Sequence, residues 1–569
     1  MKFWILLVAT LGIVLQLAVI SPSGTKVNDN LLFWSSHGHD GIWHIAVANE
    51  LQRTFPPLNP IFAGEKLVNY HFFSDIPLAF INSLTGIPKI TLYFHILPVI
   101  YSFFLGYFAY KAGKELGRNK LTGLFSVFAV YFIGSFGFIV TLLQNRGVGG
   151  ESLFWATQVQ SSIGNPPQIL ANIFLLAFTY YLARYLQGGS LQGRVPPCQK
   201  LLLTLLPALA SASKIYAGLV IYPALLIVAM YRYIATKKTD LLIISVISGL
   251  LTLAIYLPFT KSAGSFLIWE PLWYGKRLFL DAGRIGIPNF AFVLQHYESL
   301  TSIKSHIGLF VKYDFPALLL MIFGNLGVRL LGFLAIPVLF KKNKLISIFL
   351  LATAGIAFII PNLFLQKGVA TNTSQTFQYM LLVFGLYFAL ATSSLFSKIH
   401  NLRSKTLFLI VVFALSIPTQ IGLLHEFYRR PAFAKISRAE LEALSFIKNN
   451  YQGNQTILTP PYDRYYEEVG NPTPHIWDWF DTSYVAALSE KQTYFADYEQ
   501  VDIMGYDYQH RKNIQESIFQ TEFDPDMFKQ EKINLIYFPK TRAPKTNFST
   551  IPTMKKVYNN SEVEIWEIK

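Results

Sequence analysis

The sequence predicts an all-α, polytopic membrane protein that ends in a small α/β domain. Two observations predict this class. First, 52% of the residues are hydrophobic and only 14% are charged, whereas a soluble globular chain carries about 25% charged residues. Second, apolar runs long enough to cross a bilayer recur along the chain and stop near residue 427. A single cysteine, Cys198, excludes an internal disulfide framework and cysteine-rich metal sites.

The membrane part is predicted from the apolar runs, because a helix needs about 20 mostly apolar residues to cross a bilayer. A shorter run, 201–212, ends in Ala-Ser-Ala-Ser before Lys214, and we expect a half-helix that turns back within the membrane. With this run counted, the sequence predicts about eleven crossings. The longer runs are 3–20, 90–110, 121–143, 167–186, 214–232, 240–259, 316–340, 345–364, 376–396 and 406–424.

Loop charges predict the orientation. Lysine and arginine gather in four short loops, which the positive-inside rule assigns to the cytoplasm. The N-terminus is then cytoplasmic, and the tail is extracytoplasmic, in a multi-pass protein of the cell (plasma) membrane. The long loops 21–89, 144–166 and 260–315 then face outward. The basic residues of the short loops are Lys111, Lys114, Arg118, Lys120, Arg232, Lys237, Lys238, Lys341, Lys342, Lys344, Lys398, Arg403 and Lys405.

The net charge of +15 does not indicate nucleic-acid binding. Residues 428–569 carry 17 basic and 20 acidic side chains, so the positive excess lies in the membrane part. There the positive-inside bias accounts for it. We therefore expect membrane lipid, and no nucleic acid, as a partner.

Residues 428–569 are predicted to form the α/β domain, and residues 1–427, including outer loop 21–89, the membrane domain. Ser437-Arg-Ala-Glu440 is a capping box that opens a helix through Lys448. Buried strands are expected at 456–459 and 533–538, and a hairpin at 556–568 that turns at Asn559-Asn560. Two aromatic segments, 462–466 and 477–481, could bind carbohydrate or could pack the core of this domain.

The first outer loop holds the densest candidate chemistry. In His37-Gly-His-Asp40-Gly-Ile-Trp-His44, Asp40 and His44 stand four residues apart and share one face of a helix. His71 and Asp75 repeat this spacing. A carboxylate at a membrane surface can act as a general base, or it can hold a divalent cation, Mg or Mn, that neutralises a phosphate leaving group. The histidines could orient the carboxylate or ligate a metal, or these residues could only cap helices and fix the loop.

The sequence resembles the GT-C superfamily of integral-membrane glycosyltransferases, which use polyprenyl-phosphate-linked sugars. The resemblance rests on one N-terminal span, a long outer loop with an early acidic residue, many further spans and an outer C-terminal domain. Phe55-Pro-Pro-Leu-Asn-Pro-Ile-Phe-Ala-Gly-Glu-Lys-Leu-Val-Asn-Tyr-His-Phe-Phe73 also resembles a motif of uncharacterised multi-pass proteins. The run Ala208-Leu-Ala-Ser-Ala-Ser-Lys-Ile-Tyr216 is similar to a segment of the protein O-mannosyltransferase-like branch.

The resemblance implies a catalytic role for Asp40, because the acidic residue of the first outer loop is catalytic in this superfamily. Many members carry a second acidic residue there, where this sequence has Gly41. We expect His44 to assist Asp40 and the following motif to bind substrate. A lipid-phosphate donor also needs cations near the outer leaflet, and Arg329, within a span, is a further candidate. The expected substrate-binding residues are Asn69, Tyr70, His71, Asp75, Arg146, Lys214, Lys276 and Arg277.

The leading hypothesis is therefore a glycosyltransferase that moves a sugar from a polyprenyl phosphate to a glycan, lipid or protein acceptor on the outer face. A transporter or flippase of a lipid-linked saccharide would need polar residues near mid-membrane. The spans are nearly free of acidic residues, and the polar residues lie in the outer loops, which favours an enzyme. A non-catalytic membrane protein is the third alternative.

Overall fold

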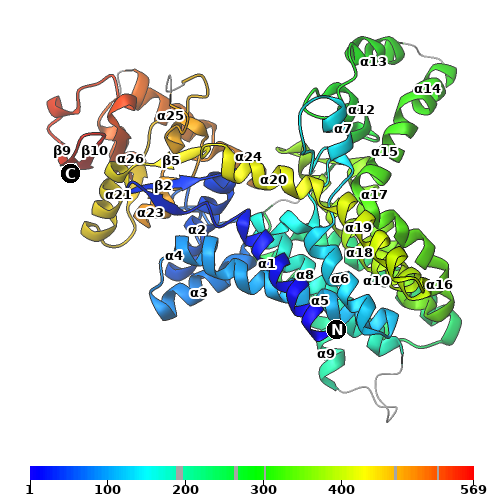
Figure 1. The fold of residues 1–569 in the computed structure, drawn as a ribbon. Coiled ribbons are helices and arrows are strands. Elements are labelled where there is room, and N and C mark those ends of the chain that lie inside the picture. Colours follow the sequence, from blue (N-terminus) through cyan, green and yellow to red (C-terminus); the bar gives the residue numbers. More distant parts are fainter. Residues whose placement is uncertain (188–196, 262–266, 300–302, 467–470, 522–523) are drawn as a thin grey trace. The chain divides into compact units, whose positions relative to one another are not determined.

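The computed structural model describes residues 1–187, 197–261, 267–299, 303–466, 471–521 and 524–569. The chain groups into two compact units (Figure 1). Unit 1 comprises residues 1–19, 99–258 and 264–426, and unit 2 comprises residues 20–98, 259–263 and 427–569. The first outer loop thus groups with the tail by its contacts. The domain division inferred from the sequence stays a prediction.

In its described residues, the protein is a mostly helical multi-pass membrane protein with seven helices long and apolar enough to cross a bilayer. The number rises to nine if each of two bent helix pairs is counted as one span. These are α6 (Lys120–Phe132) with α7 (Gly137–Leu143), bent by 41°, and α19 (Leu402–Ser416) with α20 (Pro418–Arg429), bent by 44°. The seven spans are Lys89–Gly117, Pro166–Leu186, Ile215–Thr236, Asp240–Phe259, His306–Lys342, Lys344–Leu363 and Ala370–Lys398.

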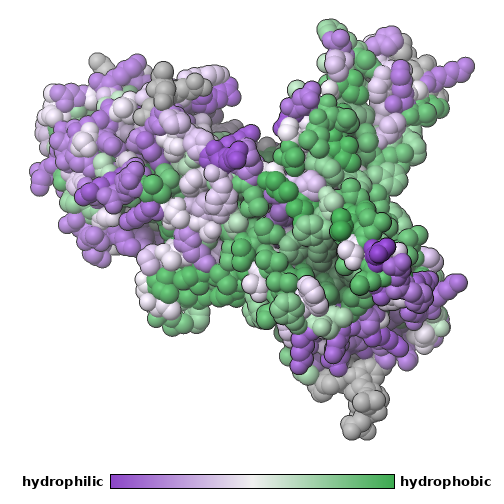
Figure 2. Space-filling view, in the orientation of Figure 1, coloured by the Kyte–Doolittle hydropathy of each residue, from purple (hydrophilic) through white to green (hydrophobic). Residues whose placement is uncertain are grey.

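Each apolar run of the sequence falls on helices, two of the runs on the bent pairs, but the count of eleven crossings is higher than the number of long spans. The runs 3–20 and 201–212 form α1 (Lys2–Ala18) and α9 (Pro197–Ser213), each of 17 residues. At 1.5 Å per residue, such helices are shorter than the hydrocarbon core of about 30 Å. Figure 2 shows the apolar surface that covers much of the helices of unit 1. The side of the membrane that each loop faces stays a prediction.

The helices of unit 1 occur along the chain in the same order as the apolar runs of the sequence. Helix α18 packs against α6 and α17, and α10 packs against α17 and α9. The remaining elements precede or connect these helices outside the seven spans. They are η3 (Val159–Gly164), β3 (Leu267–Trp269), α12 (Trp273–Leu280), α13 (Phe290–Ser299) and β4 (Phe364–Gln366). Helix α14 (Ile303–Leu309) begins just before the span that starts at His306. The spans contain α5 (Leu97–Gly117), α8 (Pro166–Leu186), α10 (Ile215–Thr236), α11 (Asp240–Tyr256), α15 (Phe315–Leu326), η6 (Gly327–Ala335), α16 (Ile336–Lys342), α17 (Lys344–Leu363), η7 (Ala370–Thr376) and α18 (Phe377–Lys398).

Arg329 is fully buried inside unit 1, where it joins two segments. Its Nη1 donates to Gln158 Oε1 at 2.8 Å, and its Nη2 donates to the carbonyl oxygen of Ile133 at 2.6 Å. Ile133 directly follows α6, and Gln158 directly precedes η3. These two hydrogen bonds explain why a buried arginine is tolerated here: Arg329 stabilises the packing of unit 1.

Replacing Arg329 with methionine is expected to destabilise the protein by about 2 kcal/mol, because two buried acceptors lose their donor. Thermal unfolding of the purified protein in nanodiscs measures the change. Arg403→Met, at an exposed position in the first turn of α19, is the matched control. Equal melting temperatures for the two variants would contradict this role.

Unit 2 is built on a five-stranded mixed sheet in the order β7-β6-β8-β10-β9. β6 (Thr456–Leu458) is parallel to β7 (Gln492–Thr493) and β8 (Leu535–Pro539), and β10 (Val563–Ile568) is antiparallel to β8 and β9 (Met554–Asn559). The helices are α2 (His37–Arg53), η1 (Phe72–Asp75), α3 (Ile76–Thr85), α4 (Lys89–Thr91), α21 (Arg438–Asn450), α22 (Ile476–Trp479), α23 (Tyr484–Ser489), α24 (Tyr498–Met504), α25 (Gln509–Gln520) and α26 (Asp526–Gln530).

The local predictions for the tail agree with the structure. Ser437 and Glu440 form the reciprocal capping box at the start of α21. The hairpin turns one residue later than predicted, because the Asn560 side chain accepts hydrogen bonds from the backbone N–H groups of Glu562 and Val563. A second sheet joins the outer loop to the tail in unit 2: β1 (Thr25–Val27), β2 (Asn30–Phe33) and β5 (Ala434–Ile436).

Candidate active site

Helix α2 carries the candidate residues of the first outer loop. Thirteen of its 17 residues are buried, so its position in unit 2 is tightly defined. Gly41 faces Phe94, and a Cβ at this position would come within 2.5 Å of the Phe94 ring. Glycine therefore stands next to Asp40 because a larger residue would collide. This packing explains why Asp40 has no acidic neighbour at position 41.

Asp40 is the outer end of a chain of three charged side chains. His39 Nδ1 lies 2.9 Å from Asp40 Oδ1, and His39 Nε2 lies 3.1 Å from Asp497 Oδ1. The side chain of Asp40 is 38% exposed, whereas those of His39 and Asp497 are 8% and 0% exposed. The buried pair thus holds one carboxylate at a solvent-accessible surface of unit 2.

The electrostatics of this chain favour its charged form. Burial lowers the pKa of His39, but its bonds and attraction to Asp497 and Asp40 outweigh burial and raise that pKa well above 6.5. Burial alone would raise the pKa of Asp40, yet the hydrogen bond and charge of His39 lower it to about 2. Asp40 also lies in the first turn of α2, where the helix dipole favours an anion. These shifts favour an ionised Asp40 and a protonated His39 at neutral pH.

The far end of the chain is fixed by backbone hydrogen bonds. Asp497 precedes α24 with φ of +51°, in the left-handed region. The N–H groups of Asp497 and Tyr498 donate to Asp481 Oδ1 and Oδ2 at 3.0 and 2.8 Å. Burial and then the charge of Asp497 raise the pKa of Asp481 to about 6. Asp481 thereby holds the turn that presents Asp497 to His39.

A second buried pair lies on the same helix. His44 Nδ1 lies 2.7 Å from Asp75 Oδ1, and both side chains are less than 10% exposed. The His44 ring stacks on Tyr93 at 5.8 Å. The hydrogen bond of His44 is thus with Asp75, from the second cluster of the loop, although Asp40 is four residues away on α2. Burial raises the pKa of Asp75.

Among the remaining candidates of the first outer loop, Tyr70 and His71 form stacked rings, and Asn69 fixes a turn by hydrogen bonds. Tyr70 stacks on His71 at 4.7 Å and meets the edge of Trp43 at 5.2 Å. Asn69, with φ of +55°, donates its side-chain amide to the carbonyl oxygens of Met504 and Lys261 at 2.8 and 3.0 Å. Asn69 therefore fixes the backbone, while Tyr70 lies beside His44 at 6.2 Å.

The four basic candidates all lie in unit 1. Arg146 donates to the backbone carbonyl groups of residues 282–284, and Lys214 is buried at the N-terminus of α10. Lys276 and Arg277 lie on α12, with the Arg277 guanidinium 5.9 Å from the centre of the Trp273 ring. The acidic candidates lie in unit 2, so each set belongs to its own unit.

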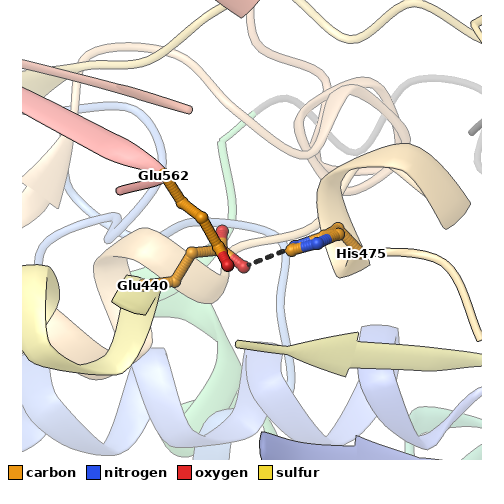
Figure 3. A group of neighbouring side chains, drawn as sticks. All are labelled: Glu440, His475 and Glu562. Carbon is orange, nitrogen blue, oxygen red and sulfur yellow. Dashed lines mark hydrogen bonds and ion pairs between the residues drawn. The ribbon is translucent and has the colours of Figure 1, made fainter. Parts of the chain in front are cut away.

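Within the described residues, one group of three potential metal ligands comes together, and it does not include Asp40. Figure 3 shows this group, Glu440, His475 and Glu562, in the tail. His475 Nδ1 lies 3.0 Å from Glu440 Oε2, which also accepts the backbone N–H of Ser437 in the capping box. The donor set suits a divalent cation, but Glu440 already serves the start of α21.

Three members of the candidate site, His39, Asp481 and Asp497, were not predicted from the sequence. His39 stands directly before Asp40, so its proximity was readable from the sequence. Asp497 lies 458 residues from His39, and no local pattern connects the two. Asp481 falls in an aromatic segment that the sequence offered only as carbohydrate-binding or core.

Neither a protein-family model nor a curated protein matches the sequence. Solved structures of the oligosaccharyltransferase AglB from Archaeoglobus fulgidus are similar in fold. Its complex with an inhibitory peptide and a dolichol-phosphate matches 95% of this chain and 69% of that chain, with a TM-score of 0.53 and 15% identity. Its complex with Zn and sulfate matches 94% and 68%, with the same score and identity.

A weaker likeness, with a TM-score of 0.43 and 10% identity, covers 99% of this chain and 98% of ArnT from Cupriavidus metallidurans bound to undecaprenyl phosphate. The similarity to AglB is one of fold. The chain is accordingly a multi-pass membrane protein with a GT-C-like fold and a small C-terminal domain with a mixed sheet.

Proposed function

We propose that the protein is a glycosyltransferase that moves a sugar from a polyprenyl-phosphate donor to an acceptor hydroxyl on the outer face of the membrane. One observation carries the proposal: the accessible carboxylate of Asp40 is held by the buried pair of His39 and Asp497. Buried ionisable groups that fix an exposed one are typical of active sites. The fold supports it, since AglB, of similar fold, is an oligosaccharyltransferase whose structure contains dolichol-phosphate.

In the proposed reaction, the acceptor oxygen attacks the anomeric carbon of the donor sugar. The bond from that carbon to the phosphate oxygen breaks, and the polyprenyl phosphate leaves with the bonding electrons. Asp40 would accept the hydroxyl proton; alternatively, it would hold a divalent cation that would neutralise the leaving phosphate, and an oxygen of that phosphate would take the proton. A carboxylate that stays ionised down to a pH of about 2 keeps its charge for a cation throughout the physiological range, whereas its low pKa makes it a weak proton acceptor.

The other predicted residues take supporting roles in this proposal. His44, braced by Asp75, and the rings of Tyr70 and His71 would line the substrate beside Asp40. Arg146, Lys214, Lys276 and Arg277 would bind the donor phosphate, since cations stabilise phosphate oxygens. Asn69 would keep the loop in place.

A sugar-transfer assay tests the proposed function. Purified protein in lipid nanodiscs is incubated with radiolabelled polyprenyl-phosphate sugars and a membrane extract as the source of acceptor. We expect label to leave at least one donor lipid and enter the acceptor fraction, and an EDTA-treated sample tests the cation role. Crossing of intact donor between the leaflets of vesicles, with no cleavage of any donor, would instead support the flippase.

A further inference from the structure

A cavity of about 470 Å³ lies wholly within the tail part of unit 2. This volume is within the range of small-molecule sites, about 300–1,000 Å³. The segments 460–465, 480–481, 495–499 and 512–516 line it. The two aromatic segments that the sequence singled out thus contribute to one cavity, through Tyr462 and Tyr465 and through Phe480 and Asp481.

The exposed rings of the tail gather at this cavity. Among the described residues from 427 to 569, the exposed large apolar side chains are Tyr428, Tyr462, Tyr465 and Tyr498. Three of these four line the cavity, and Tyr465 is 78% exposed. Exposed aromatic side chains that cluster on one surface indicate binding, whereas isolated ones need no explanation. Tyr498 is held in place by a 2.9 Å hydrogen bond between its hydroxyl and that of Tyr508.

Carboxylates with unused acceptors complete the lining. Glu499 and Glu516 line the cavity and form no hydrogen bond or ion pair with any other residue that the structure describes. No Leu, Ile, Val or Met side chain is among the lining residues. A site for an acyl chain or for apolar peptide side chains would be lined by such aliphatic groups. Ring faces beside free carboxylates instead fit a ligand that is a ring carrying hydroxyl donors.

The cavity adjoins the candidate active site. Asp481 lines the cavity and also accepts the backbone N–H of Asp497, whose carboxylate is bonded to His39. Glu499 interacts electrostatically with His39, Asp40 and Asp497. A ligand in the cavity would therefore contact Asp481, whose carboxylate holds the turn that presents Asp497 to His39.

We infer that this cavity binds a carbohydrate, with the tyrosine rings stacked on the sugar and Glu499 and Glu516 accepting its hydroxyl groups. This inference rests on the proposed function and deepens it, because it assigns the acceptor to the carbohydrate class.

Saturation-transfer NMR on the full chain in nanodiscs tests the inference without any donor. The probes are the methyl glycosides of glucose, galactose, mannose, N-acetylglucosamine and N-acetylgalactosamine. We expect saturation of the ring protons of at least one glycoside. Tyr465→Ala and Glu499→Gln should each raise the Kd of that glycoside about tenfold, as expected for loss of one stacking or hydrogen-bonding partner.

Tyr428→Ala removes the exposed tyrosine that does not line the cavity and is the matched control, with an unchanged Kd expected. Tyr465 is largely exposed, so its truncation leaves the core intact. Absence of saturation for every glycoside, or a Kd unaffected by both variants, would overturn the inference. So would binding only of a serine- and threonine-containing peptide. Sugar transfer without glycoside binding would overturn the inference alone, and glycoside binding without transfer would overturn only the proposed function.

Discussion

Asp40→Asn is expected to reduce sugar transfer by about 10²- to 10⁴-fold, the usual contribution of a general acid–base group. Asparagine has nearly the same shape and its amide oxygen can still accept the hydrogen bond from His39. It cannot take a proton from the acceptor, and it adds no charge for a cation. The protein should therefore remain folded while the reaction is lost.

Initial rates with saturating donor measure this effect, and thermal unfolding verifies the fold. Asp29→Asn is the matched control, since Asp29 lies in the same outer loop, is 67% exposed and is paired with Arg438. Its rate should equal that of the wild type. A rate for Asp40→Asn within about threefold of the wild type, far below the effect of a lost base, would move the catalytic residue elsewhere.

Asp497→Ala is expected to destabilise the protein by about 3–5 kcal/mol, the cost of leaving a buried charge without its partner. Asp497 is fully buried, and its removal leaves the protonated ring of His39 unpaired on that side. Because His39 also orients Asp40, sugar transfer should fall as well. Thermal or denaturant unfolding in nanodiscs measures the loss, and exposed Asp507→Ala is the control.

The shifted pKa values of His39 and Asp40 predict how the stability of the folded protein depends on pH. The folded pKa of His39 is raised above its unfolded value, so its contribution is complete below a pH of about 6.5 and is lost as the pH rises through the folded pKa. The folded pKa of Asp40 is lowered, so its contribution is present above about 3.9 and is lost as the pH falls through about 2. In Asp497→Asn, the alkaline decline should move to lower pH. If stability depends on pH in Asp497→Asn as it does in the wild type, the pair of His39 and Asp497 does not stabilise unit 2.

Much of the fold could be predicted from the sequence, because membrane helices and helix caps are local patterns. Each apolar run falls on helices, two of the runs on bent helix pairs, and the capping box at Ser437 begins α21 as predicted. The two short runs were counted as crossings because apolar composition does not show where a helix ends. Nothing local connects the first outer loop with the tail, although β2 pairs with β5 more than 400 residues away.

The candidate site was predictable only in part, for the same reason. Asp40 was identified from its place in an outer loop and from the resemblance to a superfamily. His39, the partner of Asp40, is adjacent in the sequence. The role of His39 depends on its contact with Asp497, which only the tertiary structure creates. His44 and Asp75 were each identified, but periodicity paired them within their own helices rather than with one another.

The release of polyprenyl phosphate in a single turnover tests the central claim most directly. Wild-type protein and Asp40→Asn, each in molar excess over one labelled donor lipid in nanodiscs, are compared with acceptor present. The account predicts that the wild type converts the donor to polyprenyl phosphate and a glycosylated acceptor in equal amounts, while Asp40→Asn binds the donor and leaves it intact. Equal release by both proteins would contradict the role of Asp40. The proposed glycosyltransferase activity would be contradicted if both proteins bind the donor and neither cleaves it, although an acceptor that binds the wild type is present.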